Sequence, residues 1–199
     1  RDRMIAVSYQ TGFDASPRTT NFIYVSHDGG RTWRNERAAN PLGRTQADDI
    51  VTFAKPGVAL RTYISFLGIR TRHPARAETG IFVARSDDAG ITWAKPVTAA
   101  DHLNTVLPFE DKPAITADGQ DVYVAWTRFD EYGVKDADCR THIIVAKSSD
   151  GAKTFAMPRP ISDSPGNCID SDDTVEGAVP AIGLDGPVHV VWAGPRGIV

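Results

Sequence analysis

Three copies of one eight-residue pattern constrain this chain more than any other feature of its sequence. The pattern joins a Ser, an Asp, a Gly and a Thr to a closing aromatic residue. It reads SHDGGRTW at 26–33, SDDAGITW at 86–93 and SSDGAKTF at 148–155. The closing aromatic residues are 60 and 62 residues apart, so the chain is built from a repeat of nearly constant length.

Short runs rich in β-branched and aromatic residues flank each copy of this box. In the second repeat the runs are DIVTFAK, RTYISFLG, GIFVARS and ITWAKPV, and the fourth run of the third repeat is TFAMPRPIS. Gly, Asp and Pro separate the runs, which is typical of strands and turns. Four-stranded units that repeat around an axis are the blades of a β-propeller, so we predict an all-β fold. A β-sandwich with chance similarity among its turns is the alternative.

The repeat divides the chain into four units of one incomplete propeller domain. Partial blades are expected at 1–38 and 176–199, and blades at 48–99 and 110–162. In the second strand of each unit we match Tyr9, Phe66, Trp126 and Trp192. The terminal units lack strands, so we expect exposed sheet edges and remaining blades outside this chain.

Each box has the residues of a tight turn between the third and fourth strands. The Asp accepts backbone N–H groups, the Gly adopts positive φ, and the aromatic residue packs between sheets. A ligand or metal site is the alternative interpretation. The third copy departs by placing Ala152 where the others have Gly. The box residues are Ser26, Asp28, Gly30, Thr32, Trp33, Ser86, Asp88, Gly90, Thr92, Trp93, Ser148, Asp150, Thr154 and Phe155.

This pattern resembles the Asp-box, or BNR repeat, of the sialidase (neuraminidase) superfamily. The run FEDKPAITADGQDVYVAWTRF at 109–129 is further similar to bacterial sialidase-like proteins. The resemblance implies a six-bladed β-propeller, of which roughly three to four blades lie in this chain. It also implies a glycoside hydrolase that removes terminal sialic acid from glycoconjugates. Asp-boxes occur in propellers without catalysis too, so a glycan- or protein-binding module is the alternative.

The long loops are expected on the face opposite the boxes, because successive strands alternate in direction. Loops on a rigid scaffold are where function usually resides. These loops span 36–49, 68–80, 99–111, 128–140 and 163–177.

The resemblance implies a site with an arginine clamp, an Asp acid/base and a Tyr nucleophile activated by a Glu. Asp111 and Glu176 are the catalytic candidates, and Arg128, Asp130 and Arg196 are the substrate-binding candidates. Asp48 and Asp49 are assigned the same place as Asp111, one blade earlier. The alternative for each is a solvated or capping loop charge. The segment carrying the first clamp arginine has no match here, and the nucleophile would lie beyond Val199.

Composition narrows the partners and the compartment. The net charge is −3 with no Lys/Arg block, which disfavours nucleic acid, and no apolar run is long enough for a membrane-spanning helix. The five His residues lack metal-ligand spacing, so we expect no metal and no cofactor. A sialylated or other glycan is the expected substrate. Cys139 and Cys168 lie in loops of one face, either as free thiols or as a disulfide, which would indicate a secreted or periplasmic protein.

Overall fold

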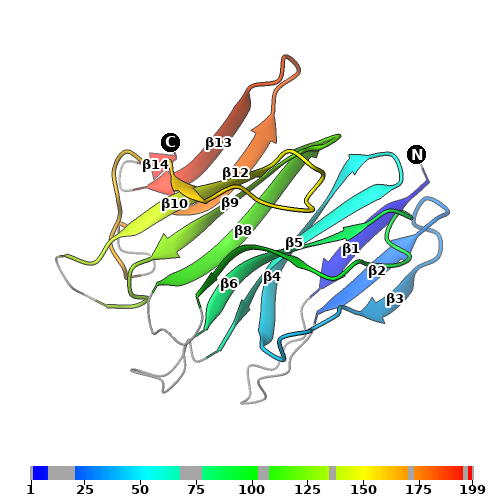
Figure 1. The fold of residues 1–199 in the computed structure, drawn as a ribbon, viewed down its shortest axis with the longest axis horizontal. Helices are drawn as coiled ribbons and strands as arrows, with labels where there is room; N and C mark the ends of the chain where they lie inside the picture. The colour runs from blue at the N-terminus through cyan, green and yellow to red at the C-terminus, as the bar shows by residue number, and fades with distance from the viewer. Residues whose placement is uncertain are drawn as a thin grey trace.

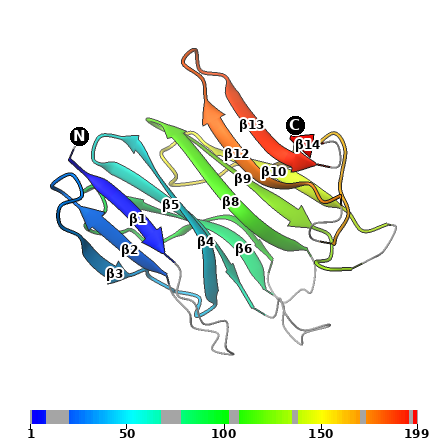
Figure 2. The same cartoon turned by 180° about the vertical axis from the view of Figure 1, so that it is seen from behind.

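The computed structural model describes residues 2–8, 21–67, 78–102, 108–134, 138–169, 173–194 and 197–198. Every regular element in these residues is a β-strand. The strands form four antiparallel sheets that stand side by side, in chain order from the N-terminus to the C-terminus (Figure 1 and Figure 2). The all-β prediction is therefore confirmed, and each sheet is called a blade below.

The strands of each blade follow one another along the chain. Blade 1 contains β1 (Met4–Ser8), β2 (Phe22–Ser26) and β3 (Arg34–Arg37). Blade 2 contains β4 (Thr45–Lys55), β5 (Val58–Phe66), β6 (Thr79–Ser86) and β7 (Val97–His102). Blade 3 contains β8 (Phe109–Asp118), β9 (Asp121–Phe129), β10 (Thr141–Ser148) and β11 (Arg159–Pro160). Blade 4 contains β12 (Glu176–Ile182), β13 (Val188–Gly194) and β14 (Gly197–Ile198).

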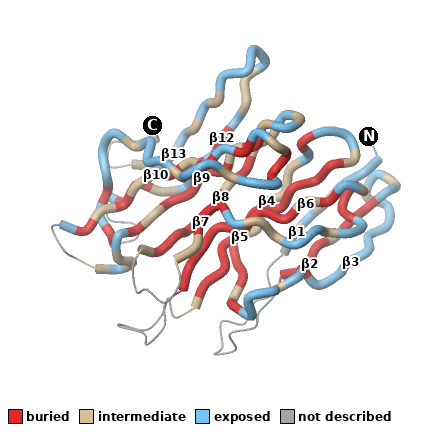
Figure 3. The backbone as a smooth tube through the Cα atoms, in the orientation of Figure 1, coloured by how far each residue is buried: buried red, intermediate tan, exposed pale blue. Residues whose placement is uncertain are grey.

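The main hydrophobic core lies between blades 2 and 3. Alternate residues of β5, such as Leu60 and Ile64, pack in one buried cluster with Val124 and Trp126 of β9. Burial is concentrated in the two middle blades, whereas the outer blades are more exposed (Figure 3). The period of two on these strands thus buries a face of each middle blade against its neighbour.

The aromatic residues of the second strands align differently from the sequence prediction. Strand register places Tyr63, not Phe66, at the position of Trp126 and Trp192. Tyr63 and Phe66 are three positions apart and therefore face opposite sides of β5. A run of apolar letters does not tell which side is meant, so the match to Phe66 was wrong. Tyr9 lies outside the described residues.

The fourth strands begin later than predicted. They were expected at 91–97 and 154–162, but β7 starts at Val97 and β11 covers only Arg159–Pro160. The box turn continues until the backbone N–H of Thr92 or Thr154 is bonded to the box aspartate. The chain meets the third strand again at Ala94 and Ala156, whose N–H groups donate to Arg85 O and Lys147 O at 2.8 Å, but regular pairing resumes only after Pro96 and Pro158.

All three boxes turn through two consecutive residues with left-handed backbone. The φ angles are 72° and 84° at Gly29 and Gly30, and 75° and 66° at Gly151 and Ala152. In the second box the residue before Gly90 is Ala89, at 59°. A glycine at either position thus suffices for this turn, and an alanine takes the other position at some cost in backbone strain. The departure of the third box from the pattern is therefore a swap of these two positions.

Candidate functional site

Each box aspartate is bonded within its own turn. Asp88 Oδ1 accepts hydrogen bonds from Ser86 Oγ and Thr92 N, both at 2.8 Å, and Oδ2 accepts one from Thr92 Oγ1 at 2.6 Å. The same contacts recur around Asp28 and Asp150. These bonds, led by the Thr hydroxyl, lower the pKa of Asp28 and Asp88 to about 2, and they also lower that of Asp150. The box carboxylates therefore stabilise turns.

The boxes share one end of the blades with the turns between first and second strands. Ala89 N donates to Gly57 O at 2.8 Å, and Gly151 N donates to Gln120 O at 2.9 Å. These hydrogen bonds hold the two turns of each blade together. The longer loops lie at the opposite end of the blades, where we place the candidate site.

At that opposite end, the first strands β4, β8 and β12 each carry a β-bulge. The register shifts after Ala47, Asp111 and Glu176, which therefore occupy equivalent positions in blades 2, 3 and 4. The next residue has positive φ in every case, namely Asp48 (54°), Lys112 (46°) and Gly177 (72°). Bulges re-aim side chains and are common next to active sites. Asp48 is thus equivalent to Lys112. From the sequence, Asp48 was assigned to the place of Asp111, and that assignment was wrong.

Asp111 is the buried acid of this rim. Asp111 is only 8% exposed, and Lys112 N donates a hydrogen bond to its Oδ1 at 3.0 Å. Burial, followed by the nearby Asp48 carboxyl, raises the pKa of Asp111 to about 7, against the opposing effect of Lys112. Glu176 is the next charge, and its Oε1 lies 2.5 Å from Lys112 Nζ. The rim therefore joins one carboxyl that titrates near neutrality to two further carboxyls and one cation.

Arg128 is held by a buried carboxylate at the same end of blade 3. Its Nε and Nη2 lie 2.9 and 2.8 Å from Glu110 Oε1, and its side chain keeps 27% of its surface exposed. Glu110 is fully buried and also accepts a hydrogen bond from Trp126 Nε1. His102 Nε2 from blade 2 is 2.6 Å from Glu110 Oε1. Glu110 thus fixes the orientation of Arg128 within blade 3, and His102 contacts Glu110 across the seam between blades 2 and 3.

Two more arginines at this end are paired in the same way. Arg44 contacts Glu78 at 2.9 Å and Asp101 at 2.8 Å. Arg61 is bonded to Asp49, and burial raises the pKa of Asp49 to about 6 although Arg61 opposes the shift. These guanidinium groups neutralise carboxylates of the chain itself.

The remaining candidates are Asp130, which lies in the loop after β9, and Arg196. Asp130 is exposed, and its Oδ2 accepts a hydrogen bond from Arg140 N at 3.1 Å, which closes this loop. Arg196 lies outside the described residues. The sequence interpretation missed Glu110 and Lys112, although Pro113 inside a strand signals the bulge beside them.

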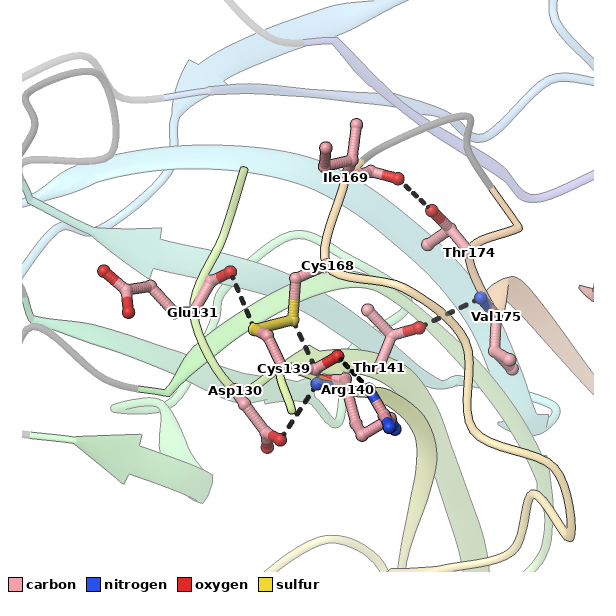
Figure 4. The surroundings of a disulfide bond; sticks show 9 residues. All are labelled: Asp130, Glu131, Cys139, Arg140, Thr141, Cys168, Ile169, Thr174 and Val175. Carbon is pink, nitrogen blue, oxygen red and sulfur yellow. Dashed lines mark hydrogen bonds between the residues drawn. A yellow bond between two sulfur atoms is a disulfide. The ribbon is translucent and has the colours of Figure 1, made fainter. Parts of the chain in front are cut away.

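Cys139 and Cys168 form a disulfide with a Cα–Cα distance of 5.7 Å. It joins the loop after β9 to the segment that leads into β12 (Figure 4). Thr141 contributes further links, because its backbone pairs with Gly166 and its Oγ1 accepts a hydrogen bond from Val175 N at 3.0 Å. The segment that ends at Glu176 is thereby tied to blade 3.

Neither a metal site nor a membrane span is found in the described parts of the chain. No group of three or more His, Cys, Asp or Glu side chains there could hold a metal ion. No helix among those residues is long and apolar enough to cross a membrane.

Comparison with protein families identifies a BNR/Asp-box repeat at residues 24–35. No curated protein sequence matches the chain. Solved structures match it over nearly its whole length. A Penicillium chrysogenum α-L-arabinanase complexed with arabinobiose has a TM-score of 0.66 at 16% identity, covering 96% of this chain and 54% of its own.

Two other matches are similar in extent. The Hadza microbial sialidase Hz136 has a TM-score of 0.64 at 17% identity, covering 98% of this chain and 40% of its own. A protein of unknown function from Dyadobacter fermentans has a TM-score of 0.64 at 16% identity. The match covers 96% of this chain and 58% of that protein. The chain thus has an Asp-box propeller fold like that of glycoside hydrolases, and it spans about half the length of these structures or less.

Proposed function

We propose that the chain forms part of a glycoside hydrolase of sialidase type, with its site at the bulged rim of β4, β8 and β12. The supporting observation is the placement of Asp111 there, buried beside Asp48 and close to the Lys112–Glu176 pair. A carboxyl with a pKa of about 7 exchanges protons readily at neutral pH. Asp111 would therefore protonate the leaving glycosidic oxygen and later take a proton from water.

The other candidates have roles that suit this reaction. Glu176 would activate the nucleophile, held in place by Lys112 Nζ. Arg128, fixed by Glu110 and partly exposed, would contact the substrate carboxylate together with Arg196. The exposed carboxylate of Asp130 would accept a sugar hydroxyl. The clamp and the nucleophile would be completed by residues outside 1–199, in the other blades of a six-bladed propeller.

The disulfide supports a location outside the reducing cytosol. Disulfides such as Cys139–Cys168 persist in oxidising compartments, and this one ties together two loops of the proposed site. Secretion or export to the periplasm would also bring the enzyme to its glycoconjugate substrates.

The pairing of the rim arginines favours a second candidate function. Arg44, Arg61 and Arg128 are each bonded to a carboxylate of the chain, which reduces their attraction for an acidic sugar. A non-catalytic propeller that binds a neutral glycan, or a protein, would need no free arginine clamp.

A substrate comparison tests the proposal. The protein containing this chain is incubated with fluorogenic sialosides and arabinofuranosides from pH 5 to 9. Sialoside turnover that declines above about pH 7 is expected, because Asp111 must then carry its proton. Turnover of arabinofuranosides alone would reject the sialidase assignment. Saturable glycan binding with no turnover of either substrate would establish the binding module instead.

A further inference from the structure

Glu110 is a buried carboxylate that groups from two blades hold in place. Its Oε1 accepts a hydrogen bond from Arg128 Nε at 2.9 Å and lies 2.6 Å from His102 Nε2, and its Oε2 accepts one from Trp126 Nε1. The backbone N–H and C=O of Glu110 are both bonded to Thr79 Oγ1 of blade 2, at 3.2 and 3.3 Å. The carboxylate therefore stays beside Arg128 and cancels its charge.

The net charge of this cluster depends on His102. With a neutral imidazole, the guanidinium of Arg128 and the carboxylate of Glu110 leave no net charge. Histidine gains a proton between about pH 8 and about pH 5, and a protonated His102 would give the cluster one positive charge. The side chains of Arg128 and His102 are 27% and 25% exposed, whereas that of Glu110 is 0% exposed. A ligand anion can therefore contact both cationic groups without contacting the carboxylate.

Other titratable and charged groups lie around this cluster. Blade 2 contributes one bonded group of three side chains, namely Arg44, Glu78 and Asp101. On blade 3, His142 of β10 is the cross-strand neighbour of Arg128, and β9 separates it from Glu110. Asp111 follows Glu110 in β8, and its pKa is about 7. His102 thus differs from these groups in contacting the carboxylate that neutralises Arg128.

We propose that Arg128 and His102 form a carboxylate-binding site that binds its ligand tightly only when His102 carries a proton. Glu110 occupies the Nε–Nη2 edge of Arg128, so the Nη1–Nη2 edge faces away from it and is the one offered to the ligand. An acidic sugar would then bind at mildly acidic pH although Arg128 is paired within the chain. The inference rests on the proposed function only in taking an acidic sugar as the ligand.

A pair of ligands tests the site by binding rather than by turnover. The protein containing this chain is prepared as Asp111→Asn, which removes the rim carboxyl with a pKa of about 7. Calorimetry gives Kd for the methyl α-glycoside of sialic acid and for its uncharged carboxamide, between about pH 5 and about pH 8. We expect the preference for the acid over the amide to be about 3–10-fold greater at the acidic end of this range.

Three substitutions in this parent assign the effect. His102→Gln keeps a donor for Glu110 but carries no charge, so the preference should stay at its alkaline value at every pH. His102→Lys is charged throughout, so the preference should stay at its acidic value. His142→Gln is the matched control, because it removes the other imidazole beside Arg128, and it should keep the pH dependence of the parent.

The outcomes separate this site from the proposed reaction. Unchanged pH dependence in His102→Gln, or an acid that binds no better than the amide at any pH, would overturn the site. Loss of the pH dependence in His142→Gln alone would overturn it as well, since the other imidazole would then be responsible. Absence of sialoside turnover by the unsubstituted protein, with the His102-dependent preference intact, would reject the hydrolase and keep the site.

Discussion

The carboxyl groups at the two ends of the blades are held in opposite states. Asp28 and Asp88 are engaged by donors of their own turns, which lower the pKa of each to about 2. Burial raises the pKa of Asp111 to about 7 and that of Asp49 to about 6 at the other end. Local donors thus keep a carboxylate charged down to low pH, whereas burial raises the pH at which a carboxyl loses its proton. The carboxylates at the box end stabilise turns, and Asp111 at the rim is suited to donate a proton.

The largest expected effect is on turnover. Asp111→Asn removes the proton that the proposed reaction needs while keeping the shape of the side chain. We expect kcat to fall by about 10²–10⁴-fold, with no loss of thermal stability, because a neutral amide is easier to bury than a carboxylate. Asp118→Asn at the exposed end of β8 is the control and should retain full activity. An Asp111→Asn enzyme within a factor of about two of wild type would remove Asp111 from the mechanism.

The next effect is a pH dependence of opposite sign at the two ends. The pKa of Asp111 is higher in the folded chain than the ordinary 3.8, so its contribution to stability falls as pH rises from about 4 to about 7. The pKa of Asp88 is lower in the folded chain, so its contribution is present above about pH 4 and falls as pH drops towards 2. Urea midpoints across pH 2–8 therefore should separate the two variants. Asp111→Asn gains on wild type between pH 4 and 7, and Asp88→Asn approaches wild type only below pH 4. The same sign for both variants would contradict the comparison.

A smaller effect on stability comes from the box serine. Ser86 is 1% exposed, and its Oγ accepts Gly90 N at 2.7 Å while donating to Asp88. Ser86→Ala leaves the buried Gly90 N–H without its acceptor, which should cost about 1–3 kcal/mol of unfolding free energy without changing kcat. Ser149→Ala, at an exposed position of the third box, is the matched control. A loss of activity at unchanged stability would assign the box a functional role.

The sequence predicts the box end of this molecule far better than the rim. A box turn is local, since its Ser, Asp, Gly and Thr satisfy one another within eight residues, and its spacing alone indicates the blades. The rim depends on strands far apart in the chain. Arg128 and Glu110, for example, meet only because β8 and β9 pair in one register.

The bulges explain the errors at the rim. One extra residue in a strand changes which side chain faces the site, as it does for Asp48 relative to Asp111. The sequence offers Pro113 as a sign of the bulge in β8, but Asp48 has no such neighbour. The aromatic match failed for a related reason, because Tyr63 and Phe66 differ only in the face of β5 that they occupy.

The smallest effect separates burial from charge as the cause of the raised pKa of Asp111. The Asp48 carboxyl is the second cause after burial, and Asn tolerates the positive φ of 54° at this position. Asp48→Asn should therefore keep the bulge while removing one anionic neighbour, and the pKa of Asp111 should fall by up to about one unit. Because the proposed acid must be protonated, the alkaline decline of kcat/KM should move from about pH 7 towards pH 6. Lys112→Gln is the opposing variant, since loss of a cation raises this pKa. If neither substitution moves the decline, burial alone sets the pKa of Asp111, and the rim carboxyls do not act as a coupled group.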